Sequence, residues 1–149
     1  MATSTGRIDR VALTPAPARP PAGVTEALRE ADQVVLAPGS LFTSLLAVLV
    51  VPDVGAAVAS APGLVVQVGN VCPDVESAGL AAADHVATVL AHGARVDTYL
   101  APTGGRVLLD PAAVEALGTR VVSADVADPT RGVHHEERLA TALRGLLST

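Results

Sequence analysis

Short apolar runs alternate with segments of helical periodicity along most of the chain. Residues 34–36 and 64–70 hold the most strongly apolar runs, which are rich in Val and have few polar positions. Runs of this kind are typical of strands that are buried on both faces of a parallel sheet. Shorter apolar runs predict further strands at residues 10–13, 96–100 and 121–123.

Helices are predicted between these strands. Apolar residues recur at helical spacing in residues 24–31 and 80–92, and Asp110 followed by Pro111 is a typical helix start, which Gly118 then ends. The remaining helices are expected at residues 41–51, 52–61 and 135–147. Because strands and helices alternate, we expect an open, mainly parallel, Rossmann-like α/β sheet with helices on both faces.

The chain length of 149 residues is that of one domain, long enough to bury a core of its own. We therefore expect residues 1–149 to form a single domain, with a flexible N-terminus at residues 1–9. Residues 14–23 are rich in Pro and predict an extended connection between the first strand and the first helix. Only Phe42 and Tyr99 are aromatic, so the core must be built from Val, Leu and Ala.

The first buried strand runs through Pro38, Gly39 and Ser40 directly into an apolar helix. Ser40 is a good N-cap, and the first turn of the helix offers unpaired N–H groups at the positive end of the helix dipole. The hydroxyls of Thr43 and Ser44 follow closely, so the junction predicts an anion site, with phosphate as the obvious ligand. The alternative is a plain corner between strand and helix that happens to have a good N-cap.

Ligands of open α/β sheets bind beyond the carboxyl ends of the strands, which places the loop after residues 64–70 on the same edge as this junction. Asn70 can donate and accept there, toward a base, a sugar hydroxyl or a phosphate, or it can stabilise its own turn. Asp74 and Glu76 could bind a metal ion or sugar hydroxyls, or simply be solvated. His85 either points back toward this loop or is a surface residue without partners.

Composition excludes several classes of function. The net charge is −5, there is no Lys, and the ten Arg are scattered, which argues against a nucleic-acid partner. The single cysteine, Cys72, excludes an internal disulfide and fits a reducing compartment; with no base beside it in the sequence, it is interpreted as a structural thiol. No signal peptide or membrane span is visible, so we expect a soluble, cytoplasmic protein without a membrane partner.

The segment His134-His135-Glu136-Glu137 looks like a metal cluster at first sight. Adjacent side chains on a helix diverge, however, and the i, i+4 His pair of a zinc helix is absent. We therefore interpret the segment as the start of the last helix, with acidic residues at its positive end. The chain also lacks a Gly-rich phosphate loop of the G-x-G-x-x-G or P-loop type.

Three stretches together carry a family resemblance: ADQVVLAPGSLFTSLLAVLVV at residues 31–51, VVQVGN at 65–70 and ADHVATVLAHG at 83–93. In this order and spacing they resemble the YvcK family of gluconeogenesis factors, a UDP-sugar-binding group within the CofD-like superfamily. That family carries Pro-Gly-Ser-Leu-Tyr-Thr-Ser at the junction, and Phe42 stands here in the place of Tyr. The family also has a strand ending in Asn, as at Asn70, and Asp-His opening a helix.

The resemblance implies a regulatory protein that binds a UDP-sugar or related phosphate ligand and is linked to central carbon metabolism and cell-wall or cell-shape control. It implies neither catalytic residues nor a metal site, and favours a protein that is not an enzyme. The ligand-binding residues it implies are Pro38, Gly39, Ser40, Thr43, Ser44, Asn70, Glu76 and His85. The alternatives are a CofD-like 2-phospho-L-lactate transferase of deazaflavin coenzyme synthesis, which alone would need magnesium, and an interaction module that has lost its ligand.

The chain also departs from the family pattern, and these departures predict features of the structure. Members of the family begin with a Gly-Gly-Gly-Thr-Gly turn after their first strand, and this chain has none, so it resembles only the C-terminal half of the CofD/YvcK-like fold. Ala47 and Val48 replace a usual Pro-Asn pair. We expect an uncovered sheet edge with apolar surface beside it, and therefore a homo-oligomer or pairing with a separate N-terminal half.

Overall fold

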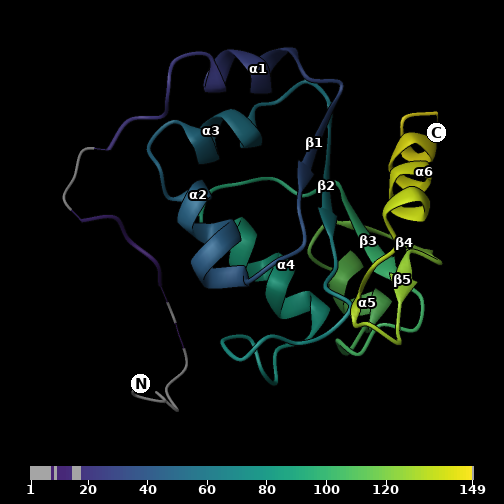
Figure 1. Ribbon diagram of the computed structural model, residues 1–149. Coiled ribbons are helices and arrows are strands. Elements are labelled where there is room, and N and C mark those ends of the chain that lie inside the picture. Colours follow the sequence, from purple (N-terminus) through teal and green to yellow (C-terminus); the bar gives the residue numbers. More distant parts are fainter. Residues whose placement is uncertain (1–7, 9, 15–17, 149) are drawn as a thin grey trace.

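A four-stranded, all-parallel sheet forms the centre of the molecule (Figure 1). The computed structural model describes residues 8, 10–14 and 18–148. The strands lie in the order of the chain: β1 Gln33–Leu36, β2 Leu64–Val68, β3 Thr98–Pro102 and β4 Arg120–Ala124. The predicted parallel α/β architecture is confirmed, although β3 lies two residues further along than its apolar run indicated.

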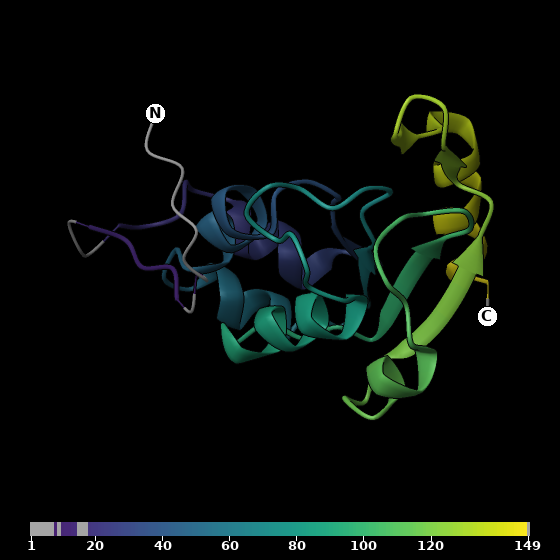
Figure 2. The ribbon, with the colours of Figure 1, turned by 90° about the horizontal axis from the view of Figure 1, so that it is seen from below.

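Helical segments connect the strands and cover both faces of the sheet. They are α1 Val24–Glu30, the π-helical η1 Leu41–Leu46, α2 Ala47–Leu49, α3 Val54–Ala59, α4 Ala82–Ala91, α5 Pro111–Glu115 and α6 Glu136–Leu146. The main core packs η1, α2, α3, α4 and α5 on one face of the sheet. A smaller cluster, including Val66 and Leu100, packs under α6 on the other face. Figure 2 shows α4 and α6 on opposite sides of the sheet.

A two-stranded antiparallel hairpin, β5 Ala127–Asp128 with β6 Val133–His134, was not predicted. Strands of two residues are too short to show a hydrophobic period. The hairpin is fixed to the sheet by His134, whose Nε2 donates to the carbonyl of Gly69 at 3.0 Å. It therefore lies beside the carboxyl end of β2.

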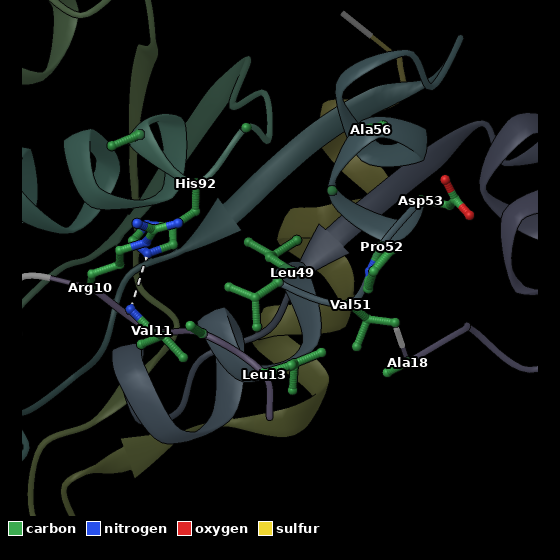
Figure 3. Close-up of a pocket in the computed structure, with 15 residues that line it drawn as sticks. Arg10, Val11, Leu13, Ala18, Leu49, Val51, Pro52, Asp53, Ala56 and His92 are labelled. Atoms are coloured by element: carbon green, nitrogen blue, oxygen red, sulfur yellow. Dashed lines mark hydrogen bonds between the residues drawn. The ribbon is translucent and has the colours of Figure 1, made fainter. Parts of the chain in front are cut away.

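The predicted strand at residues 10–13 is wrong. This segment has no regular secondary structure and joins no strand of the sheet. The backbone N–H of Val11 instead donates to Nε2 of His92 over 3.5 Å, while Nδ1 of His92 donates to the carbonyl of Thr88 at 2.7 Å. The segment borders a hollow of about 780 Å³ between the end of α4 and the turn from α2 to α3 (Figure 3). This hollow lies at the amino ends of the strands, on the edge away from the predicted ligand site.

Burial of β1 on both faces is the second prediction that the structure corrects. Val34 and Leu36 enter the main core, but Val35 points to the other face and is 39% exposed. The physical reason is that α6 packs over β2, β3 and β4 and leaves most of this face of β1 uncovered. Among the described residues β1 is also an edge strand of the sheet, which agrees with the open edge expected from the sequence.

The N-terminal predictions fall mainly on residues outside those described. Of the flexible segment expected at residues 1–9, the structure describes Ile8, which is half-buried against the main core. Residues 15–17 of the Pro-rich connection likewise lie outside the described part. No helix within the described residues is long and apolar enough to cross a membrane.

Candidate functional site

The carboxyl ends of β1 and β2 are tied together by one side chain. Nδ2 of Asn70 donates to the carbonyl of Gly39 at 2.8 Å, and the N–H of Gly39 donates back to Oδ1 of Asn70 at 3.1 Å. Asn70 therefore stabilises the neighbouring junction rather than its own turn. Its amide keeps one N–H and one oxygen lone pair for a further partner, and the contacts are solvent-exposed.

Ser40 caps the helical run of residues 41–49 as predicted. Its Oγ accepts from the N–H of Thr43 at 3.4 Å and from Oγ1 of Thr43 at 2.8 Å. The first turn is π-helical, because the N–H of Leu45 donates to the carbonyl of Ser40, five residues earlier, at 3.0 Å. The N–H of Ser44 also donates to this carbonyl, at 3.2 Å, which is the ordinary α-helical bond. The wide turn leaves the two hydroxyls of Ser40 and Thr43 side by side at the start of the helix.

Glu76 fills the position where the sequence predicts an external anion. Its Oε2 accepts from Oγ of Ser40 and lies 3.1 Å from Oγ1 of Thr43, whose single hydroxyl hydrogen is shared between Ser40 and Glu76. The carboxylate lies at the positive end of the helical run, where negative charge is favourable. An incoming phosphate must therefore exchange with Glu76, whereas a sugar hydroxyl can add to its remaining acceptor positions.

His85 lies behind the loop of residues 70–79 rather than on the surface. It is 3% exposed, and its Nε2 has no partner among the described residues. Burial lowers the pKa of His85, although the charges of Asp74 and Asp84 act in the opposite direction. The fully buried Ser77 donates its N–H to Asp74 at 2.7 Å. His85 thus belongs to a polar layer beneath the loop, and the surface alternative is wrong.

The remaining predicted ligand residues do not join the Glu76 network. Ser44 is exposed, and with Pro38 it borders an apolar groove on the outer side of β1. The structure therefore brings together Gly39, Ser40, Thr43, Asn70 and Glu76.

A second part of this edge was missed by sequence reasoning. A hollow of about 520 Å³ lies beyond β3, with Asn70 on its wall and the loop of residues 103–109 around it. Arg106 in this loop is exposed and brings a positive charge. The signal available in the sequence was the Thr-Gly-Gly turn at residues 103–105, directly after a buried strand.

Arg106 also changes the interpretation of Cys72. Its Nη2 donates to Sγ of Cys72 at 2.8 Å, and its backbone N–H donates to the carbonyl of Val71 at 2.7 Å. The thiol thus has a basic neighbour in space, 34 positions away in the chain, although no base stands beside it in the sequence. The contact joins the loop after β2 to the loop after β3.

Tyr99 forms the floor of the hollow beyond β3, directly under Gly69. A Cβ atom on Gly69 would overlap the phenol oxygen of Tyr99, so glycine is required for the close approach. Burial raises the pKa of Tyr99 to about 12, which keeps the phenol protonated.

These features define an open α/β protein with polar groups gathered beyond the carboxyl ends of adjacent parallel strands, where such folds bind their ligands. The family model described as 2-phospho-L-lactate transferase CofD matches residues 2–135. The chain therefore belongs to the CofD family.

Known relatives of the chain carry the name that the sequence resemblance indicated. A putative gluconeogenesis factor from Deinococcus radiodurans is 36% identical over 102 residues, which cover 68% of this chain and 22% of that protein. A putative gluconeogenesis factor from Nostoc is 34% identical over an alignment of 151 positions, and the match covers 85% of this chain and 33% of that protein. The resemblance to gluconeogenesis factors is thus confirmed.

A solved structure of a UPF0052-family protein from Bacillus halodurans has the same fold. It matches with a TM-score of 0.83 and 29% identity, over 93% of this chain and 50% of that chain. The chain therefore spans half or less of the length of these three relatives.

Proposed function

We propose that the chain is a regulatory protein of the gluconeogenesis-factor type that binds a nucleotide sugar of the UDP-sugar class at the carboxyl ends of β1 and β2. In this proposal the protein regulates central carbon metabolism. Because UDP-sugars are precursors of the cell wall, it also affects cell shape. The name of the relatives supports the first of these links.

The observation that carries this proposal is the hydrogen-bond network between the hydroxyls of Ser40 and Thr43 and the carboxylate of Glu76. It lies beside the side chain of Asn70 that ties the ends of β1 and β2 together. Two hydroxyls and the N–H groups of a helix start provide donors for a phosphate. The displaced carboxylate of Glu76 can then accept from a sugar hydroxyl. The hollow beyond β3 extends from Asn70 toward Arg106 and offers room and positive charge for the rest of the ligand.

A second candidate follows from the description of the matching family model. A 2-phospho-L-lactate transferase would bind a GDP-linked donor, with magnesium neutralising its pyrophosphate. Within the described residues, no group of three or more His, Cys, Asp or Glu side chains could hold a metal ion. Carboxylate ligands would have to come from Asp74 and Glu76, together with phosphate oxygens of the substrate.

The test is thermal unfolding of the 149-residue chain with UDP-N-acetylglucosamine, with UDP-glucose, and with GDP plus magnesium. A ligand that binds only the native state at about 100 times its Kd stabilises it by about 2.7 kcal/mol. We expect a rise in Tm of roughly 5 °C or more with a UDP-sugar. A rise only with GDP plus magnesium would favour the transferase. A cooperative transition that no ligand shifts would contradict both and favour an interaction module.

Ser40→Asp tests the site itself. Aspartate is as good an N-cap as serine, so the fold should persist, but its charge opposes both Glu76 and a phosphate. We expect the ligand-induced rise in Tm to disappear in Ser40→Asp and to remain in the control Ser148→Asp, at an exposed position near the C-terminus. An unchanged rise in Ser40→Asp would remove Ser40 from the site.

A further inference from the structure

The hydroxyl of Tyr99 has no hydrogen-bond partner among the described residues. The side chain is 2% exposed and lines the hollow of about 520 Å³ beyond β3. A buried tyrosine hydroxyl usually finds a partner, because a polar group that is buried without one destabilises the fold. The partner of this hydroxyl is therefore to be sought outside the chain, in the hollow that Tyr99 lines.

Other hydrogen-bonding groups without charge border the same hollow. The amide of Asn70 keeps one N–H and one oxygen lone pair after its two bonds to Gly39. The exposed hydroxyl of Ser123 forms no hydrogen bond within the described part of the chain. Because burial raises the pKa of Tyr99 to about 12, its phenol is also a neutral donor and acceptor. Neutral donors and acceptors in this mixture are complementary to the hydroxyls of a sugar.

The base of a nucleotide is less well suited to this hollow. Proteins commonly hold a flat base by stacking it on an aromatic side chain. The sequence has two aromatic residues, and both are buried: Phe42 is 4% exposed and Tyr99 is 2% exposed. Neither ring therefore presents a face on which a base could stack. The volume itself lies within the range of about 300–1,000 Å³ that is typical of small-molecule sites.

We propose that the hollow beyond β3 holds the sugar of the nucleotide sugar, and that the hydroxyl of Tyr99 distinguishes this ligand from the bare nucleotide. The inference rests on the proposed nucleotide-sugar site. Asn70 joins the two parts of that site, because its amide is bonded to the β1 junction and also borders the hollow. A ligand with its phosphates at Ser40 thus reaches the hollow past Asn70. In this arrangement Glu76 accepts from the ribose, on the other side of the phosphates.

The first test compares UDP with UDP-N-acetylglucosamine by isothermal titration calorimetry. We expect the parent chain to bind the UDP-sugar more tightly than UDP. Tyr99→Phe should bind UDP as the parent does and lose about fivefold in affinity for the UDP-sugar, the effect of one hydrogen bond. Its midpoint of urea unfolding should not fall, because the hydroxyl has no partner among the described residues. The control Ser148→Ala removes an exposed hydroxyl near the C-terminus and should change neither affinity.

Two outcomes of the calorimetry would overturn the inference while leaving the proposed function intact. Equal affinities of Tyr99→Phe and the parent for the UDP-sugar would show that the hydroxyl touches no ligand; a lower urea midpoint would then indicate a hydroxyl held by internal water. An equal loss for UDP and the UDP-sugar would place the nucleotide or its phosphates in the hollow. A parent chain that binds neither ligand would contradict the proposed function and this inference with it.

Intrinsic fluorescence gives a second, local readout. Tyr99 is the only tyrosine and the chain has no tryptophan, so tyrosine fluorescence reports on the hollow alone. N-acetylglucosamine 1-phosphate should change this fluorescence in a saturable manner, whereas inorganic phosphate should not. Ser123→Leu places an apolar side chain at an exposed position beside the hollow and should abolish the effect of the sugar phosphate without unfolding the chain. No change with the sugar phosphate, or the same change with inorganic phosphate, would contradict a sugar in the hollow.

Discussion

Gly69 shows how one residue shapes the candidate site. It lies at the end of β2, packed against the side chain of Tyr99 and directly before Asn70 in the chain. Its N–H donates to the carbonyl of Leu100 at 2.9 Å, which continues the pairing of β2 with β3 by one residue. The absence of a side chain lets Tyr99 close the floor of the hollow beyond β3.

Gly69→Ala should destabilise the protein by about 2 kcal/mol, because the new Cβ overlaps the buried phenol of Tyr99. Gly145→Ala is the control, since a Cβ there meets nothing and alanine favours the helix. Urea unfolding of both variants checks the prediction. Equal stabilities of Gly69→Ala and the parent chain would show that Tyr99 moves aside without cost.

The buried His85 predicts the direction of the pH dependence of stability. Its pKa in the folded protein lies below the ordinary value of 6.5, so the unfolded chain binds the proton more readily. Stability should therefore fall as the pH drops from about 7 to about 5.5, the range in which the unfolded imidazole becomes charged. Burial also lowers the pKa of His134, which adds a contribution of the same sign.

His85→Leu should flatten this pH dependence, measured as the free energy of unfolding in urea at several pH values. His134→Gln should flatten it less, because His134 is the less buried of the two. A parent chain with constant stability over this range would contradict the prediction for both histidines.

The loop of residues 70–79 is the element on which the site depends. Asn70 fixes its start to the β1 junction, and Glu76 fixes its middle to the start of the helical run. Half of the loop residues are exposed, so its order depends on these hydrogen bonds together with the contacts of Arg106 to Val71 and Cys72. The same bonds must rearrange if a phosphate takes the place of Glu76.

Glu76→Gln keeps the shape of the side chain and removes its charge. We expect a loss of about 0.5–1 kcal/mol, small because the contact is exposed, together with faster amide hydrogen exchange in the loop. Glu115→Gln, at an exposed position on α5, should change neither quantity. Identical exchange in the two variants would show that Glu76 does not hold the loop.

Several elements could be predicted because their signals are local. Ser40, Asp110 and Gly118 mark helix boundaries through capping and a left-handed turn, and all three lie where expected. The prediction of a strand at residues 10–13 was wrong, because an apolar run does not show whether a partner strand is within reach. The β5–β6 hairpin left no periodic signal at all.

The candidate site was predictable only in part, because some of its contacts join side chains that are far apart in the chain. The Asn70 and Ser40 segments were brought together by a topological rule that needs only the strand ends. The contact of Arg106 with Cys72, and the Glu76 carboxylate at the helix start, depend on side-chain positions that are 34 and 36 residues apart in the chain. No spacing rule connects such pairs.

At the scale of the whole molecule, the uncovered face of β1 and the candidate site adjoin each other. Pro38 and Ser44 border the groove, while Gly39 and Ser40 belong to the site. A ligand bound at the candidate site would therefore lie close to the groove, because both features share residues 38–44 of the chain.

The strand order carries a consequence for how the protein is made. Each strand pairs with the strand that precedes it in the chain, so the sheet can grow one strand at a time while synthesis proceeds. The last helix completes this process, because the carbonyl of Leu143 accepts from the side chain of Gln33 at 3.0 Å. The beginning of the sheet is thus fastened by a helix that is synthesised after all four of its strands, and a chain released before α6 would keep its strands but lose that fastening.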